Sequence, residues 1–253
     1  MNRILNTLAV SILMSFAGQA IAAGNAVLLE IYDKTTNEVL SEYAHKRDTW
    51  VKGERNHIFQ LGLRNTTNSR LLAVLSVDGL NVINGKTADF NQPGYILPPY
   101  GSITISGWRK SLNKVAQFYF TSPTDSYATR TLNPDNIGIF GMAVFAENEP
   151  IPQPAEYMDQ PFRAPAPASA RSGKSMLDSY NSAGLGTGHG SQIYDRVQKA
   201  EFDKQAIPLE VVTVRYDTRQ NLISRGILHP RYTPPKDGPN AFPLESFTPD
   251  PKF

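Results

Sequence analysis

The feature that most constrains the fold is a succession of short apolar or alternating segments between residues 26 and 147, separated by turn-forming residues. In the segment "NHIFQLGLRN", Phe59, Leu61 and Leu63 occupy every second position. Because successive side chains of a β-strand point to opposite faces of a sheet, we expect these three residues to face a core. About eight or nine short strands of this kind are typical of an antiparallel β-sandwich.

Other segments predict how the strands pair. "AVLLEIYD" and "EVLSEYAH" flank the polar residues 34–37, which predicts a β-hairpin. The segment "RLLAVLSVDGLNVING" begins with residues that are apolar on both sides, as in a central strand. No alternation of strands and helices is present in this part of the sequence, so we predict an all-β sandwich over residues 23–147.

A change in composition follows this predicted domain. Six prolines lie between residues 150 and 167, and small and polar residues follow, which predicts a semi-rigid linker over 148–183. Residues 184–230 contain one clear strand, "PLEVVTVRYD", and an ambiguous segment over 192–202 that suits a helix or a strand. A segment this poor in strands rarely builds its own core, so we expect a C-terminal arm that docks on the sandwich, for instance at an exposed sheet edge. A proline-rich tail occupies residues 231–253.

The first residues have the order of a secretory signal peptide. Arg3 precedes an apolar run over residues 4–16, and Ala20, Ile21 and Ala22 supply the small residues of a cleavage site. We therefore expect cleavage after Ala22 and a periplasmic or secreted mature protein. No later segment has about 20 consecutive apolar residues, so we expect no transmembrane segment in the mature chain.

Composition excludes several function classes. The chain has no cysteine, which excludes disulfides, thiol catalysis and a lipid-anchored cysteine. Its 25 basic and 23 acidic residues nearly balance, so no strongly cationic surface for nucleic acid is indicated. The four histidines lack metal-ligand spacing and no serine lies in a G-x-S-x-G motif, so we expect no metal site and no cofactor.

The first candidate site is the glycine stretch "GLGTGHGS", which contains Gly186, Gly188, His189 and Gly190. Backbone N–H groups of a glycine loop can hold an anion at the start of a helix, and Ser191 is placed to cap such a helix. However, no lysine stands where a phosphate-binding loop has one. We therefore favour a flexible or tightly turning connection, and anion or small-ligand binding stays the alternative.

The second candidate site combines two further segments. "GWRKS" places Trp108 and Arg109 directly after a predicted strand, and "SYATRT" places Tyr127 and Arg130 in a predicted loop. If these meet at one end of the sandwich, they offer an aromatic and cationic surface for a sugar, a peptide or an anion. The alternative, which we favour, is that Trp108 belongs to the core and the basic side chains lie at its rim.

Several strings resemble those of a family of uncharacterised exported proteobacterial proteins. They are "VDGLNVINGKTA", "GWRKS", "VAQFYFT", "SYATRT", "NIGIFGMAVF", "LGTGHG" and "VRYDTRQNLISRGIL". The resemblance covers about residues 75 to 228 and implies a periplasmic or cell-envelope location. It also implies that the C-terminal part belongs with the sandwich, and it implies no catalytic or binding residue.

The sequence thus favours an exported envelope protein that binds another protein or an extracellular polymer without catalysis. Two alternatives stay open. One is a hydrolase that uses His189 as its base or as an electrostatic element beside Arg109, Arg130 or Arg215, which requires a nucleophile or water within hydrogen-bond reach. The other is an anion or small-ligand binder at the glycine stretch.

Overall fold

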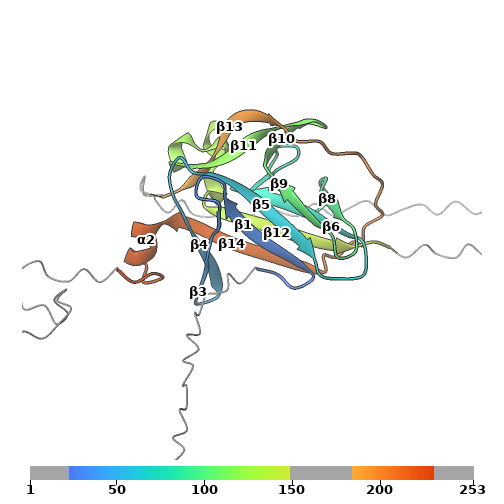
Figure 1. Cartoon of the computed structure of the whole chain (residues 1–253), viewed down its shortest axis with the longest axis horizontal. Coiled ribbons are helices and arrows are strands. Elements are labelled where there is room, and N and C mark those ends of the chain that lie inside the picture. The colour runs from blue at the N-terminus through green and yellow to red at the C-terminus, as the bar shows by residue number, and fades with distance from the viewer. Residues whose placement is uncertain (1–22, 149–183, 231–253) are drawn as a thin grey trace, which may run out of the picture.

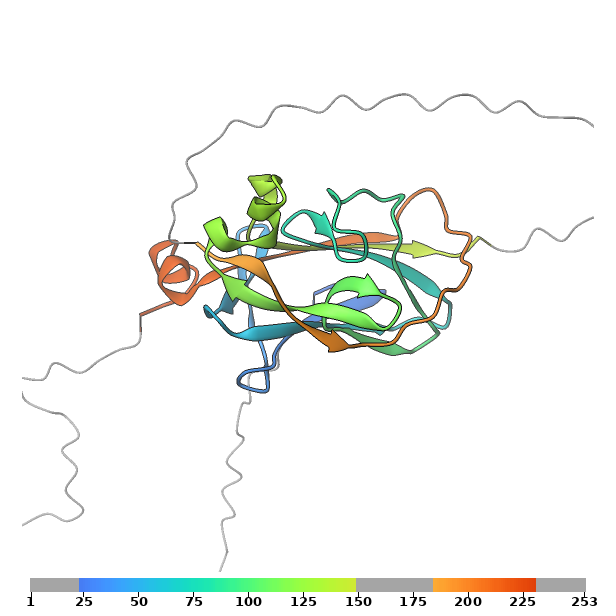
Figure 2. The same ribbon diagram turned by 90° about the horizontal axis from the view of Figure 1, so that it is seen from above.

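The computed structural model describes residues 23–148 and 184–230, which form two β-sheets packed face to face (Figure 1). Figure 2 shows the two sheets edge on, one above the other. The predicted all-β sandwich is therefore confirmed. The predicted signal peptide, residues 149–183 of the predicted linker and the predicted tail lie outside the described residues.

The first sheet, called sheet A, is antiparallel throughout. Its strands are β1 (Val27–Asp33), β2 (Glu38–Val39), β5 (Ile58–Asn65), β9 (Ser102–Ile105), β10 (Gly107–Ser111), β11 (Lys114–Thr121) and β13 (Gly186–Tyr194). β11 pairs with β10 and β5 on one side and with β13 on the other. β13 therefore extends sheet A at its edge.

The second sheet, called sheet B, contains the other C-terminal strand. Its strands are β3 (Glu42–His45), β4 (Asp48–Gly53), β6 (Leu71–Val77), β7 (Leu80–Asn81), β8 (Tyr95–Leu97), β12 (Ile139–Ala146) and β14 (Glu210–Thr218). β14 lies between β12, its antiparallel partner, and β4, its parallel partner. The expectation that the arm adds a strand at an exposed edge is thus wrong for β14, because its alternating Val212, Val214 and Tyr216 are buried in the core.

The core lies between the sheets and is rich in aromatic rings. Phe59, Leu61 and Leu63 are at most 1% exposed, which confirms the prediction from their alternation. The ring of Phe59 stacks on Phe120 with 4.4 Å between centroids, and Phe140 stacks on Tyr216 at 4.5 Å. Residues from all parts of the described chain meet here, so the C-terminal arm completes the same core.

The predicted N-terminal hairpin is shorter than expected. β1 pairs with β2 through Tyr32 and Val39, so the turn at residues 34–37 is confirmed. The chain then leaves sheet A, and β3 pairs with β4 in sheet B. A single alternating segment in the sequence thus supplies strands to both sheets.

Short helices occupy the connections. They are η1 (Pro123–Asp125), α1 (Tyr127–Arg130), η2 (Pro134–Asn136) and α2 (Arg219–Ser224). The Ser126 side chain accepts a hydrogen bond from the N–H of Thr129 and so caps α1, as serine does at helix starts. The helix considered for residues 192–202 is wrong, because β13 continues to Tyr194 and the following residues are irregular. Within the described ranges, no helix is long and apolar enough to cross a membrane.

Candidate functional site

The glycine stretch is strand β13, so the predicted turning connection and anion loop are wrong. Gly186 and Gly188 are two residues apart and therefore lie on one face of the strand, whereas the register with β11 shifts between His189 and Gln192, beside Gly190. The Tyr119 side chain occupies the space that a Cβ atom on Gly188 would need. A Cβ on Gly186 would approach Ser126 to 2.7 Å. Glycine is required here because other side chains approach closely, and the G-x-G-x-G spacing was itself a strand signal.

We expect Gly188→Ala to lower the free energy of unfolding by about 1–3 kcal/mol, because the new methyl group displaces the Tyr119 ring. Urea unfolding measures the change. Gly62→Ala on β5 is the matched control, since its Cβ would meet no atom closer than 3.8 Å. Gly62→Ala should shift the unfolding free energy by less than about 1 kcal/mol. Equal losses in the two variants would contradict the steric explanation.

Four of the predicted site residues do meet at the edge of the sandwich. The Trp108 Nε1 atom donates a hydrogen bond to the carbonyl oxygen of Gly188 at 3.0 Å. The Tyr127 ring lies 4.8 Å from the Trp108 ring and 5.2 Å from the His189 ring. Trp108 is only 3% exposed and belongs to the core, so its face is not free to stack on a sugar.

His189 lies in this aromatic cluster with a lowered pKa. Burial is the main cause, and the positive charge of Lys110 adds to it. The imidazole is therefore predominantly neutral at pH 7. Within the described residues, no group of three histidine, aspartate or glutamate side chains is arranged to hold a metal ion.

The two arginines do not join this cluster, and the predicted aromatic and cationic surface is corrected accordingly. Arg109 donates to the Asp195 carboxylate at 2.7 Å, to the Asp195 carbonyl oxygen at 2.6 Å and to the Tyr95 hydroxyl at 3.3 Å. Its side chain is only 8% exposed. Arg130 is largely exposed and lies 3.8 Å from Asp125. Arg109 thus anchors the chain after β13, and Arg130 lies at the surface.

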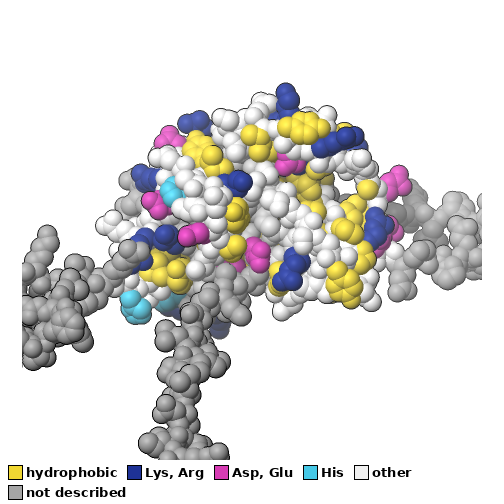
Figure 3. Space-filling view, in the orientation of Figure 1, with side chains coloured by type: hydrophobic (Ala, Val, Ile, Leu, Met, Phe, Trp, Pro, Cys, Tyr) yellow, Lys and Arg dark blue, Asp and Glu magenta, His cyan; other side chains and the backbone are white. Residues whose placement is uncertain are grey.

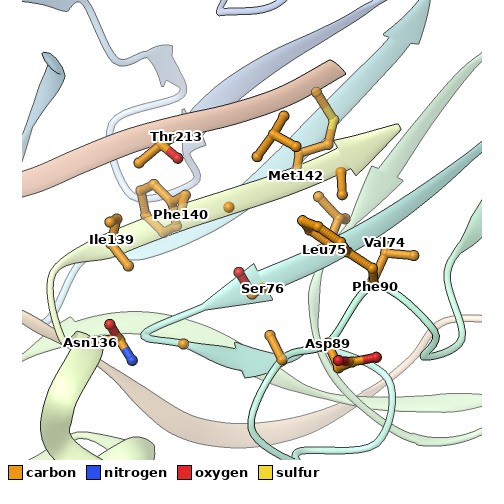
Figure 4. A pocket seen from close by; sticks show the side chains of 15 residues that line it. Val74, Leu75, Ser76, Asp89, Phe90, Asn136, Ile139, Phe140, Met142 and Thr213 are labelled. Atoms are coloured by element: carbon orange, nitrogen blue, oxygen red, sulfur yellow. The ribbon is translucent and has the colours of Figure 1, made fainter. Parts of the chain in front are cut away.

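The structure shows a different candidate site, a groove on the outer face of sheet B (Figure 4). Its volume is about 230 Å³. Side chains from three neighbouring strands and two loops line it. They include Val74 and Ser76 of β6, Ala143 of β12, Val211 and Thr213 of β14, and Asp89, Phe90 and Asn136 from the connections, Asn136 being the last residue of η2.

The groove exists because its floor is made of small residues. Gly141 lies in the middle of β12, and a Cβ atom there would approach the Ser76 Oγ atom to 2.5 Å. The larger side chains of Phe90 and Val211 also line the groove, and they are 48% and 56% exposed. Figure 4 shows Asn136 and Thr213 toward one end of the groove, Ser76 near its middle, and Asp89 with Phe90 toward the other end. The groove is therefore mostly apolar, with hydrogen-bonding side chains distributed along it.

The apolar surface continues beyond the groove. Ile207 is 79% exposed and Leu209 is 57% exposed, and both lie in the irregular segment that leads directly into β14 and Val211. The N–H of Leu209 donates to the Val144 carbonyl oxygen, which keeps this segment alongside β12. We call Phe90, Ile207, Leu209 and Val211 the exposed apolar strip.

The chain itself covers the neighbouring part of the same face. Phe202 packs against the cluster of Leu72, Val74, Ala143 and Phe145. The Lys204 ammonium lies 4.2 Å from the centre of the Phe145 ring. Because Phe202 and Lys204 cover it, the outer face of β6 is apolar like the face in the core. The apolar residues on both sides of β6 were the one sequence signal for this outer face. The groove and the exposed apolar strip are the part that stays open.

Asp89 is the one ionisable residue among those that line the groove. The groove therefore has the chemistry of a binding surface, with apolar contacts and a few hydrogen-bonding groups.

Comparison with known protein families, curated proteins and solved structures finds no match to this chain.

Proposed function

We propose that the protein is an exported cell-envelope protein that binds another protein, without catalysis, through the groove and the exposed apolar strip. The observation that carries this proposal is the apolar outer face of sheet B that the chain leaves open beside the groove. Exposed apolar patches with a polar rim are characteristic of interaction sites. The groove volume of about 230 Å³ is smaller than the roughly 300–1,000 Å³ of pockets for small ligands. It suits one or two apolar side chains of a partner.

The geometry favours an extended segment of the partner. Leu209 and Val211 are two positions apart where the chain enters β14, which in an extended chain is about 7 Å, and Ile207 lies in the bend just before them. A partner strand with apolar residues at alternate positions matches this spacing. Ser76, Thr213 and Asn136 line the groove and can hydrogen-bond to its backbone.

Charge does not dominate the surface in view. Figure 3 shows basic and acidic side chains interspersed with apolar ones on the face that it presents. Asp89 supplies one negative charge at the groove. Because Asp89 is the one ionisable residue that lines the groove, we expect partner binding that depends weakly on salt, unlike the steep salt dependence of binding to nucleic acid.

We expect Val211→Lys and Leu209→Lys to weaken partner binding at least tenfold, because each places an ammonium group on the apolar contact surface. Both positions are more than half exposed, so stability should change by less than about 1 kcal/mol. Tyr194→Lys is the matched control, since Tyr194 is 71% exposed but lies on β13 of sheet A.

The test begins with mild envelope extraction and identification of the proteins that accompany the wild-type chain. Each purified candidate is then titrated against the three variants by calorimetry. The proposal predicts one partner that binds the wild type and Tyr194→Lys equally and the groove variants weakly. A partner that binds all four proteins equally, or a wild-type chain without any partner, would overturn it.

A further inference from the structure

Ala23 is held firmly at the start of the described chain. Its carbonyl oxygen accepts a hydrogen bond from the N–H of Leu29 at 2.7 Å. Its nitrogen lies 3.2 Å from the Leu29 carbonyl oxygen and 3.0 Å from the Glu42 Oε1 atom. A backbone amide has one hydrogen for these two acceptors, whereas an ammonium group has three. The surroundings of this nitrogen therefore suit an ammonium group better than an amide.

Carboxylates gather around this position. Glu210 accepts hydrogen bonds from the N–H groups of Asn25 and Val27, at 2.9 and 2.8 Å. Glu42 is close enough to Glu30 for the two charges to repel. Among the salt bridges that join described residues, none includes any of these three glutamates.

Glu42 is the glutamate of this group whose pKa is raised, so its ionised form is the one that a nearby positive charge would stabilise most. Its pKa is raised to about 7, mainly by burial and also by repulsion from Glu30, and the hydrogen bond from Ala23 opposes this rise. An adjacent positive charge would favour the ionised carboxylate and lower this pKa. The Ala23 nitrogen is the atom in contact with Glu42 that can become such a charge.

We propose that the α-ammonium group of Ala23, formed when the Ala22–Ala23 peptide bond is hydrolysed, binds the Glu42 carboxylate and locks the N-terminus of the mature fold. The proposal rests on the export proposed above. Hydrolysis adds one water, leaves the new carboxylate on Ala22 and gives Ala23 an amine that takes up a proton. An α-amino group has an ordinary pKa of about 7.7–8.0, so it is mostly charged at pH 7.

This ion pair links β3 of sheet B to the segment that leads into β1 of sheet A. The mature chain is thus more stable than a chain of the same residues whose α-amino group carries no charge. Processing then does more than remove a targeting segment, because it creates the cation that the folded domain binds.

The experiment compares the mature chain, residues 23–253, with the same chain acetylated at its α-amino group. At pH 7 we expect the free amine to lower the unfolding equilibrium constant about tenfold, equivalent to one pKa unit, and to raise the Tm by about 2–4 °C. In Glu42→Gln the free and acetylated chains should unfold alike. Glu38→Gln, which alters an exposed carboxylate on β2, should retain the full difference.

An NMR titration of the α-amino group provides a readout that does not depend on unfolding. Its pKa should lie above the ordinary range in the wild type and return to that range in Glu42→Gln. Equal stability of the free and acetylated wild-type chains, or an unshifted α-amino pKa, would overturn the ion pair. Mass spectrometry of the protein from its natural host tests export separately, because an N-terminus other than Ala23 would refute the cleavage and not the partner-binding groove.

Discussion

Replacing Asp78 with alanine is expected to lower the free energy of unfolding by about 4 kcal/mol, which makes it one of the two most damaging single substitutions that we predict. Asp78 is fully buried in the turn between β6 and β7. Its Oδ1 atom accepts hydrogen bonds from the Tyr216 hydroxyl and from the N–H of Gly138 at 2.9 Å. Its Oδ2 atom accepts from the N–H of Thr187 at 2.7 Å.

The size of the expected effect follows from what the substitution leaves behind. The N–H groups of Thr187 and Gly138 would lose the carboxylate that accepts from them, and an unsatisfied buried donor costs about 1–3 kcal/mol. Asp78 also has a φ of 50°, in the left-handed region that aspartate tolerates better than alanine. The carboxylate joins β13, β14 and the residue just before β12, so its loss loosens the C-terminal strands from the rest of the sandwich.

Urea unfolding measures this change, and Tyr216→Phe is the matched control. Tyr216→Phe keeps the buried ring and removes one of the three donors to Asp78, so it should cost about 1–2 kcal/mol. Hydrogen exchange should show that β13 and β14 lose more protection than β5 in Asp78→Ala. A loss below about 1 kcal/mol in Asp78→Ala would show that the network contributes little to stability.

The same carboxylate makes stability depend on pH. Burial raises the Asp78 pKa to about 6, although hydrogen bonds from Tyr216, Thr187 and Gly138 oppose this rise. Its pKa in the unfolded chain is about 3.9. The folded state therefore binds the proton more tightly, and this contribution is complete below about pH 4 and is lost as the pH rises through about 6. The difference in pH dependence between wild type and Asp78→Asn isolates this contribution.

Arg109→Ala is expected to cost about 3 kcal/mol, because it leaves the Asp195 carboxylate without its cation in a site where that side chain is only 15% exposed. The segment after β13 would also lose the hydrogen bond from Arg109 to the Asp195 carbonyl oxygen. Two backbone hydrogen bonds of this segment, from the N–H of Asp195 to the Asn113 carbonyl oxygen and from the N–H of Val197 to the Leu112 carbonyl oxygen, would then open more often. Thermal unfolding measures the loss of stability. Hydrogen exchange at residues 195 and 197 should rise more than elsewhere.

Two other variants separate charge from geometry at this position. Arg130→Ala removes an exposed arginine that lies 3.8 Å from Asp125, and it should change stability by less than about 1 kcal/mol. Arg109→Lys keeps the charge but cannot contact Asp195 and Tyr95 with one planar group, so it should recover only part of the loss. A fully stable Arg109→Ala variant would contradict the anchoring role.

Local patterns predicted the strands well. Phe59, Leu61 and Leu63 face the core as their alternation indicates, and "PLEVVTVRYD" contains all of β14 except its last residue, Thr218. The prediction of a turn at the glycine stretch is wrong, because glycine tolerates many backbone conformations and its presence alone does not distinguish a turn from a strand. The residue that explains Gly188 is Tyr119, which is far from it in the sequence.

The alternation of apolar residues was enough to establish an all-β sandwich and the core-facing side of several strands, because side-chain direction in a strand follows from local backbone geometry. The pairing partners depended on folding in three dimensions: β14 lies parallel to β4, and β13 extends the edge at β11. The groove likewise needs Gly141, Ser76, Phe90 and Val211 to meet from separate segments. Contacts between distant segments leave no periodic signal in the chain, and so they emerged only once the two sheets were assembled.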